Sequence, residues 1–147
     1  MPKDVRDERA QRPADRLTLR VYYEDTDFSG RVYHASYLRF LERSRTEWLR
    51  ARGFEQRLMA TGESIVFVVH RLSIEFIRPA AMDDLIDIET RAAGVGAASI
   101  DFAQNILRGE EHLAAATVAV VALKGGKPAR LPMEMRARLA GGPTSKM

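Results

Sequence analysis

Cysteine is absent from the 147 residues, which excludes disulfides and thiolate metal sites. The three histidines, His34, His70 and His112, are scattered and do not have the spacing of a zinc site. No apolar run reaches the ~18–20 residues that a membrane-spanning helix needs. The N-terminal residues also lack the apolar segment of a secretory signal, so we expect a cytoplasmic protein with no transmembrane segment.

Charge of one sign is not concentrated anywhere along the chain. The net charge is +3, and the 23 basic and 20 acidic residues are dispersed. Nucleic-acid binding usually needs a concentrated basic face, so we expect no nucleic-acid partner. An anionic small molecule needs only a few well-placed cations and stays compatible with this pattern.

The length of the chain suits one domain with one core. Residues 1–16 alternate in charge and contain proline, and residues 141–147 look similarly loose, so we expect both segments to be flexible tails. The single domain is therefore expected over residues 17–140.

Apolar periodicity between the tails predicts strands and one long helix. Residues 17–23 (LTLRVYY) alternate as in a strand, whereas residues 34–53 (HASYLRFLERSRTEWLRARG) have helical spacing up to Gly53. Strand-like segments follow at 70–80, 84–92, 98–109 and 112–126, and the short gaps between them favour an antiparallel meander of four strands. We predict an α+β fold in which an antiparallel sheet of about five strands curls around one long central helix.

Two details of the pattern add expectations about burial. Residues 112–126 are apolar on both faces, which predicts a strand that is covered on both sides. Arg45 lies within the apolar arc of the helix, where an unpaired charge is costly. We expect a carboxylate or an oligomer partner beside Arg45.

The segment DTDFSGRVYHASYLRF, residues 25–40, places carboxylates and a histidine where a strand gives way to the helix. Gly30 can take backbone angles closed to other residues, and the helix is expected to start near Tyr33 or His34. The first N–H groups of a helix have no intrahelical partner and can polarise a carbonyl. Asp27 upstream can supply a base or nucleophile, which completes the minimum for acyl transfer.

The same residues also fit a purely structural role. Asp27 could complete an Asx turn, Asp25 could cap local backbone, and Ser29 could cap the helix. Spacing alone leaves both interpretations open.

The segment from Tyr23 to Tyr37 fills every fixed position of the pattern Y-x-D-T-D-x-x-G-x-V-Y-H-x-x-Y. It closely resembles the opening segment of the YbgC-like acyl-CoA thioesterases, in the 4-hydroxybenzoyl-CoA thioesterase group of hotdog-fold proteins. The likeness continues through residues 68–90 (VVHRLSIEFIRPAAMDDLIDIET) and 127–132 (KPARLP), and covers about residues 17–139. It implies a hotdog fold and hydrolysis of an acyl-CoA thioester to a carboxylic acid and CoA.

The resemblance implies roles for individual residues. Asp27 is the catalytic carboxylate, either as a nucleophile that forms a mixed anhydride or as a base that activates water. The backbone N–H at His34 is the carbonyl donor, with Gly30 permitting close approach of the chain, and the His34 imidazole is either a catalytic helper or a polar pocket wall. Tyr33 and Tyr37 are expected to line the acyl pocket, although Tyr37 could equally serve in helix packing.

The implied substrate carries phosphate groups, for which cations near the pocket are expected. Arg130, with Lys124 and Lys127, lies where relatives place such a contact, although each could be a solvated surface residue. The turn at residues 94–98 (GVGAA) lacks the arginine and lysine residues that the 4-hydroxybenzoyl-CoA enzyme uses for the nucleotide phosphates. An acyl carrier protein, which also presents pantetheine, is therefore a conceivable donor. No metal or bound cofactor is required, because water is the attacking reactant.

Hotdog domains usually pair so that two sheets continue across a dimer, and an exposed edge strand favours such pairing. The resemblance thus implies a homo-oligomer, either a dimer or a dimer of dimers. Two other functions stay open: a hotdog hydratase or dehydratase using His34 and Glu47, and a non-catalytic acyl-CoA or acyl-carrier-protein binding module associated with the Tol–Pal envelope system. The complete family motif argues against the hydratase, and we interpret Glu47 as solvated or ion-paired.

Overall fold

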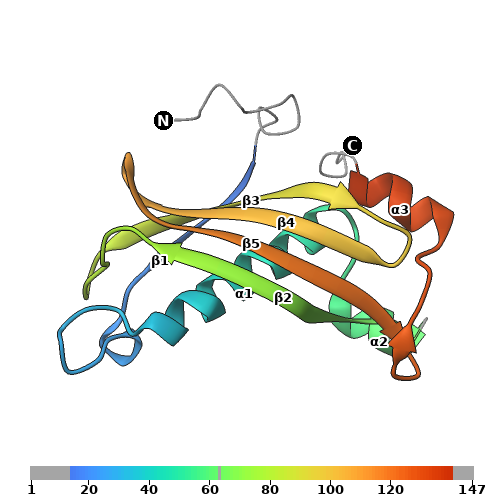
Figure 1. Ribbon diagram of the computed structural model, residues 1–147, viewed down its shortest axis with the longest axis horizontal. Helices are drawn as coiled ribbons and strands as arrows, with labels where there is room; N and C mark the ends of the chain where they lie inside the picture. Colours follow the sequence, from blue (N-terminus) through green and yellow to red (C-terminus); the bar gives the residue numbers. More distant parts are fainter. Residues whose placement is uncertain (1–13, 63, 141–147) are drawn as a thin grey trace.

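The computed structural model describes residues 14–62 and 64–140. The strands of its sheet are β1 (Asp15–Arg20), β2 (Val66–Phe76), β3 (Leu85–Val95), β4 (Ser99–Arg108), β5 (Glu111–Lys124) and β6 (Lys127–Pro128). The helices are α1 (His34–Ala51), α2 (Gln56–Gly62) and α3 (Met133–Ala140). Neighbouring strands are antiparallel in the order β1-β3-β4-β5-β2, with β6 paired to β5. The sheet curls around α1 (Figure 1), which confirms the predicted hotdog fold.

The strand order differs from the predicted meander at β2. Strands β3, β4 and β5 follow one another, but β2 pairs with β5 and lies on the far side of the sheet from β3. The link from β2 to β3 passes the start of α1, where the Val32 N–H donates to the Ala80 carbonyl at 2.8 Å. The predicted four-strand meander is wrong because a short gap favours antiparallel direction without fixing which strand becomes the neighbour.

Strand β1 is shifted toward the N-terminus relative to the prediction. It begins at Asp15, which pairs with Thr90 of β3, so the start of the sheet includes residues 15 and 16 of the expected tail. It ends at Arg20, and the chain then turns through a short 3-10 helix at Tyr23–Asp25 instead of continuing as a strand. The remainder of the expected tails, residues 1–13 and 141–147, lies outside the described residues.

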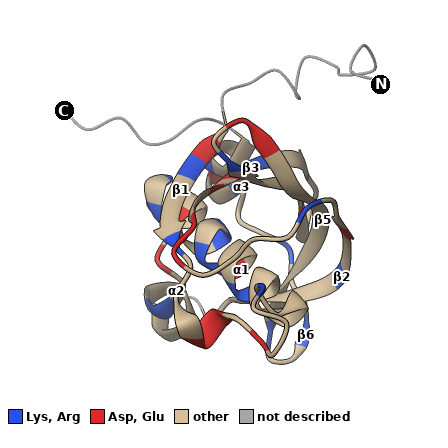
Figure 2. Ribbon diagram, turned by 90° about the vertical axis from the view of Figure 1, so that its left-hand side faces the viewer, with Lys and Arg blue, Asp and Glu red and all other residues tan. Residues whose placement is uncertain are grey.

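The core lies between α1 and the sheet. The large apolar side chains that α1 buries are Tyr37, Phe40, Leu41, Trp48 and Leu49. The Trp48 ring meets Phe102 of β4 edge-on, with ring centroids 5.1 Å apart. Figure 2 shows α1 enclosed by the strands, with acidic and basic residues distributed around the outside. Full burial of a large apolar side chain contributes about 1.5–3 kcal/mol, and the set holds α1 against the sheet.

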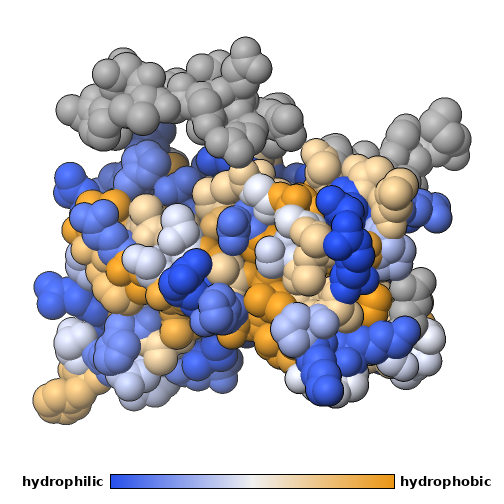
Figure 3. Space-filling view, turned by 45° about the vertical axis from the view of Figure 1, so that its right-hand side comes forward, coloured by the Kyte–Doolittle hydropathy of each residue, from blue (hydrophilic) through white to orange (hydrophobic). Residues whose placement is uncertain are grey.

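Strand β5 is covered on one side only within this chain. Ala116, Val118 and Val120 are buried, whereas Thr117 is exposed and Ala119 is half-buried on the opposite side. The prediction that this strand is covered on both sides is wrong for the single chain, because small alanines make a sequence apolar without requiring a covering layer. The face of the molecule in Figure 3 has apolar patches interspersed with hydrophilic side chains.

Arg45 of α1 is 8% exposed, but its partner is not the expected carboxylate. Its Nη1 donates to Oε1 of Gln104 at 3.0 Å, and the Gln104 amide donates to the Leu41 carbonyl at 3.0 Å and to the Thr90 hydroxyl at 2.7 Å. Burial lowers the pKa of Arg45, and the charge of Glu42 opposes that shift. A neutral amide, itself fixed by bonds to α1 and β3, therefore takes the place of the carboxylate. The alternative expectation, an oligomer partner, stays a prediction.

Candidate active site

The turn after β1 brings Asp27 to the start of α1. The Asp27 N–H donates to the Arg31 carbonyl at 3.0 Å, and the Gly30 N–H donates to the Asp27 carbonyl at 2.9 Å. Gly30 has a φ of 81°, a left-handed conformation that is favourable for glycine alone. A Cβ at Gly30 would meet no atom within 4 Å, so the backbone angle accounts for this glycine.

The Asp27 carboxylate is exposed and accepts two hydrogen bonds on one of its oxygens. The Ser29 hydroxyl donates to Oδ1 at 2.6 Å, and the Ser29 N–H donates to the same atom at 2.8 Å. These bonds, the hydroxyl first, hold the pKa of Asp27 below its ordinary value, and the nearby His34 lowers it further. The Asx turn expected as a structural role is thus present. Among the described residues, however, Oδ2 has no hydrogen-bond partner and remains available for chemistry.

The first turn of α1 presents amide donors without acceptors. Tyr33 is the N-cap residue, and its side chain makes no capping hydrogen bond. The Ser36 N–H donates to the Tyr33 carbonyl at 2.8 Å, whereas the His34 and Ala35 N–H groups have no acceptor in residues 14–62 and 64–140. Ser29, the alternative cap, binds Asp27 instead. The predicted helix start is confirmed, and its free N–H groups form the positive end of the helix dipole.

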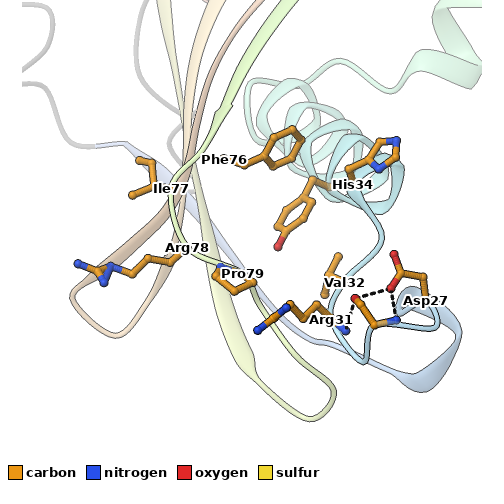
Figure 4. A pocket seen from close by; sticks show the side chains of 10 residues that line it. Asp27, Arg31, Val32, His34, Phe76, Ile77, Arg78 and Pro79 are labelled. Carbon is orange, nitrogen blue, oxygen red and sulfur yellow. Dashed lines mark hydrogen bonds between the residues drawn. The ribbon is translucent and has the colours of Figure 1, made fainter.

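Asp27 and His34 line the same pocket, which has a volume of about 270 Å³ (Figure 4). One wall is the loop that leads into α1, and the other is the end of β2 with the link to β3. The lining residues are Asp27, Ser29, Arg31, Val32, His34, Tyr37, Phe76, Ile77, Arg78 and Pro79. A carboxylate and a helix N-terminus that border one space can act on the two sides of a bound carbonyl.

The two predicted tyrosines differ in their relation to the pocket. Tyr37 borders the pocket and is also buried, with its ring 5.3 Å from the Phe76 ring between centroids and its hydroxyl accepting the Ala80 N–H at 3.0 Å. Burial raises the pKa of Tyr37, which therefore stays a neutral phenol. Tyr33 is exposed beside the His34 ring, 4.4 Å away between centroids, and is not among the lining residues. Tyr37 thus combines both expected roles, the pocket wall and the helix packing.

Arg130 lies apart from this pocket within one chain. It follows β6, at the opposite end of the domain from the loop before α1 (Figure 1), and its side chain is exposed. Lys124 and Lys127 lie at the same turn between β5 and β6. A single chain therefore does not bring this group of cations to Asp27.

The wall opposite Asp27 is the part of the site that sequence analysis misses. It consists of residues 76–79 at the end of β2 and in the link to β3, and Arg31 is a further lining residue without a predicted role. The link reaches the loop through the hydrogen bond from Val32 to Ala80, which is a contact between distant parts of the sequence. A usable signal is FIRP at 76–79, where a proline ends an apolar strand and leaves large side chains at its end.

Asp25 has the bracing role predicted for it. It is buried, and its Oδ2 accepts the Tyr22 N–H at 2.8 Å while its carbonyl accepts the Tyr33 N–H at 2.9 Å. Arg39 lies 3.7 Å from the other carboxylate oxygen. Asp25 therefore holds the loop in shape and is not free to react.

Glu47 is exposed and pairs with Arg50, with 3.2 Å between Oε1 and Nε. This confirms the interpretation of Glu47 as an ion-paired surface residue. It lies more than three turns after His34 in α1, which is about 20 Å at a rise of 1.5 Å per residue. One chain therefore does not bring His34 and Glu47 together as a hydratase pair.

Across residues 14–62 and 64–140, no group of three or more His, Cys, Asp or Glu side chains could hold a metal ion. In the same part of the chain, none of the helices has the length and apolar character needed to cross a membrane.

Comparison with known proteins identifies the family and agrees with the fold. Residues 21–139 match the family model of the thioesterase-like superfamily. The acyl-CoA thioesterase YbgC of Haemophilus influenzae is 44% identical over 121 residues, which cover 81% of this chain and 89% of that protein. The acyl-CoA thioester hydrolase YbgC of Escherichia coli O6:H1 is 44% identical over 98 residues, which cover 67% of this chain and 72% of that protein.

Solved structures of thioesterases have the same fold. A probable thioesterase from Bartonella henselae superimposes with a TM-score of 0.78 at 45% identity, covering 81% of this chain and 99% of that one. A thioesterase from Thermus thermophilus, complexed with coenzyme A and Zn, superimposes with a TM-score of 0.75 at 27% identity, covering 86% of this chain and 97% of that one. The chain therefore belongs to the YbgC-like acyl-CoA thioesterases of the thioesterase-like hotdog superfamily, a family of thioester hydrolases.

Proposed function

We propose that this protein hydrolyses an acyl-CoA thioester to a carboxylic acid and CoA, with Asp27 as the catalytic carboxylate. The observation that carries the proposal is the shared pocket, because Asp27, whose Oδ2 is unbonded among the described residues, and His34, the first residue of α1, line the same space. The YbgC relatives from Haemophilus influenzae and Escherichia coli are named for activity on acyl-CoA, which supports the same substrate class.

In this mechanism the thioester carbonyl oxygen accepts a hydrogen bond from the His34 N–H, and the helix dipole stabilises the negative charge that develops on that oxygen. A well-aimed donor of this kind contributes about 3–4 kcal/mol to transition-state stabilisation. Asp27 Oδ2 either removes a proton from the attacking water or attacks the carbonyl carbon and forms a mixed anhydride that water then hydrolyses. On both routes the C–S bond breaks, and CoA leaves as a thiolate that takes up a proton.

Other pocket residues support these two groups. The His34 side chain lies close enough to lower the pKa of Asp27, so we propose that it helps to keep the carboxylate ionised. Gly30 acts indirectly, by closing the turn that carries Asp27. Tyr37, Phe76 and Ile77 are proposed to hold the acyl group, because they give the pocket large apolar surfaces.

The proposed reaction needs no metal or bound cofactor, since water is the co-substrate and the chain supplies both the carboxylate and the amide donors. CoA is the proposed carrier of the acyl group. An acyl carrier protein as donor, a cytoplasmic location and an association with the Tol–Pal system stay predictions from the sequence.

We also propose that two copies pair through β2. This strand ends the sheet order, and no other strand of the described chain covers its outer edge. Val66, Val68 and Val69 are exposed apolar residues of this strand. An unpaired apolar edge is a template for pairing with another chain, and pairing here would continue the sheet across a dimer. Two such dimers could then form a tetramer.

The test of the catalytic proposal is Asp27→Asn, assayed by thiol release from short, long and aromatic acyl-CoAs. Asparagine keeps the size of the side chain and can accept the Ser29 hydrogen bonds, but it cannot act as the base or nucleophile. General-base catalysis contributes about 10²–10⁴-fold, so kcat should fall at least about 100-fold. Asp101→Asn, an exposed aspartate of β4 outside the pocket, is the matched control. Equal rates for Asp27→Asn and wild type would remove Asp27 from the mechanism.

A further inference from the structure

Two arginines stand at the rim of the Asp27 pocket. Arg31 lies in the loop directly after Gly30, and Arg78 lies in the link that follows β2. Both side chains are exposed, and neither has a hydrogen bond or ion pair within residues 14–62 and 64–140. Figure 4 shows Arg31 reaching toward Pro79, whereas the Arg78 guanidinium points away from Asp27. The pocket therefore has two guanidinium groups at its rim that form no ion pair within the described residues.

The carboxylate that interacts electrostatically with Arg78 is Glu111, and it already has Arg108 as its hydrogen-bond partner. Glu111 accepts a hydrogen bond from Arg108 Nε at 2.9 Å, and Arg108 is the main cause of the lowered pKa of Glu111, with Arg78 as a smaller cause. Arg108 also binds Asp84. Because Arg108 satisfies this carboxylate, Arg78 keeps its donors for another partner.

Backbone contacts hold the two arginines in place relative to each other. Arg31 forms a β-bridge with Ala81, and the Arg78 N–H donates to the Leu113 carbonyl at 3.1 Å. The Val32 N–H joins the same two segments by donating to the Ala80 carbonyl at 2.8 Å. The cations thus belong to two segments that are tied together beside the pocket, rather than to independent mobile loops.

We propose that Arg31 and Arg78 bind the phosphate groups of a coenzyme A thioester whose acyl end lies at Asp27. This inference rests on the proposed function and names the recognition site for the carrier. The pantetheine arm is peptide-like and as long as about four extended residues, roughly 14 Å, so the diphosphate must lie outside the pocket. The Arg78 guanidinium points away from Asp27, as a contact outside the pocket requires, and Arg31 is a second cation that lines the same pocket (Figure 4). Guanidinium groups bind phosphate with paired N–H donors, which suits this role.

The experiment compares two carriers of the same acyl group, CoA and pantetheine, because pantetheine lacks the phosphates. The proteins are wild type, the double variant Arg31→Gln/Arg78→Gln, and Arg57→Gln on α2 as an exposed-arginine control. In the double variant, KM for the acyl-CoA should rise about tenfold, as expected for lost charge-assisted hydrogen bonds, with kcat unchanged. KM for the pantetheine thioester should not change. Added salt should raise KM for the acyl-CoA in wild type but not in the double variant.

Several results would overturn the inference. A KM that rises equally for both carriers, or a kcat that falls with both, would mean that the arginines shape the pocket and do not bind phosphate. An unchanged KM in the double variant, together with a raised KM in Arg130→Gln, would place the phosphates at the C-terminal turn. If wild type hydrolysed neither thioester, the proposed function would fail. Calorimetric binding of free CoA and free pantetheine to the same proteins would still decide the phosphate site.

Discussion

Gln104 joins three polar groups between α1 and the sheet, and Gln104→Leu removes that junction while keeping the size of the side chain. Gln104 is 1% exposed; its Oε1 accepts from Arg45, and its amide donates to Leu41 and Thr90. Removing one partner of a buried ion pair costs about 3–5 kcal/mol, and an unsatisfied buried polar group costs about 1–3 kcal/mol. The partner here is neutral, and a crevice of about 120 Å³ beside Arg45 can admit water. We therefore expect Gln104→Leu to lower the free energy of unfolding by about 3 kcal/mol, which is at the lower end of the range for a broken buried ion pair.

Arg45→Met is the matching change on the other side of this contact. It removes the buried charge and leaves Oε1 of Gln104 without its donor, so we expect a loss of about 1–2 kcal/mol. In the double variant Arg45→Met/Gln104→Leu the charge and its partner are both absent. Apolar replacement of a buried charged group together with its partner is often neutral, so the double variant should be more stable than Gln104→Leu alone. The two single losses sum to about 4–5 kcal/mol, so a double-variant loss below about 3 kcal/mol gives a coupling energy of at least about 1 kcal/mol.

The assay is urea unfolding of all four proteins at one protein concentration, because any oligomer would make stability depend on concentration. Thermal unfolding of the same proteins is the second measurement. For a chain of this size, a loss of 1 kcal/mol in the free energy of unfolding lowers Tm by about 2–4 °C, so Gln104→Leu should lower Tm by about 6–12 °C. Additive single effects, with a coupling below about 0.5 kcal/mol, would refute the reasoning. They would mean that water in the crevice, and not Gln104, satisfies the Arg45 charge.

Two further predictions concern the site and the sheet edge. Ser29→Ala removes the hydroxyl that does most to lower the pKa of Asp27, so the pKa of Asp27 should rise. As the pH is lowered, the variant should therefore lose activity at a higher pH than wild type does, whereas the two should be equally active near neutrality. An acidic limb of the kcat/KM profile that does not move would contradict this cause. Val69→Lys places a charge on the free edge strand β2 and should reduce the mass measured by light scattering to that of one chain. The control Leu58→Lys, at an exposed apolar residue of α2, should leave the mass unchanged. A Val69→Lys protein with the wild-type mass would rule out pairing through β2.

The elements that the sequence predicts well are those set by local chemistry. Helix α1 spans His34–Ala51, close to the predicted 34–53, because its apolar period and the glycine after it are local signals. The turn that carries Asp27 is also a local feature, since it needs only Ser29 and Gly30 beside it. Its spacing alone leaves the turn and catalytic interpretations open, and the catalytic role is predicted from the resemblance of residues 23–37 to the YbgC-like family. The neighbours of β2 could not be predicted, because strand pairing depends on contacts between distant segments.

The parts of the site and the core that the sequence does not predict also depend on contacts between distant segments. The wall at residues 76–79 is brought to Asp27 by long-range contacts at Ala80 and Ala81. The FIRP sequence marks the end of the strand, but no local pattern shows which loop lies opposite it. Apolar periodicity correctly placed Arg45 inside the core, but a pattern along one helix cannot reveal that Gln104 of β4 lies opposite it. Sequence reasoning therefore detects that a buried charge needs a partner, and the sheet determines which partner it has.

Ala80 sets the width of the active-site pocket through both of its backbone polar groups. It is fully buried; its carbonyl accepts the Val32 N–H at 2.8 Å and its N–H donates to the Tyr37 hydroxyl at 3.0 Å. One bond ties the β2–β3 link to the loop that follows Asp27, and the other ties it to the first turns of α1. The separation of the two walls is therefore held by one backbone hydrogen bond and by one bond to the Tyr37 side chain, and neither involves Phe76. Substitutions at Phe76 can then change which acyl group fits while the carboxylate and the helix amides keep their relative positions.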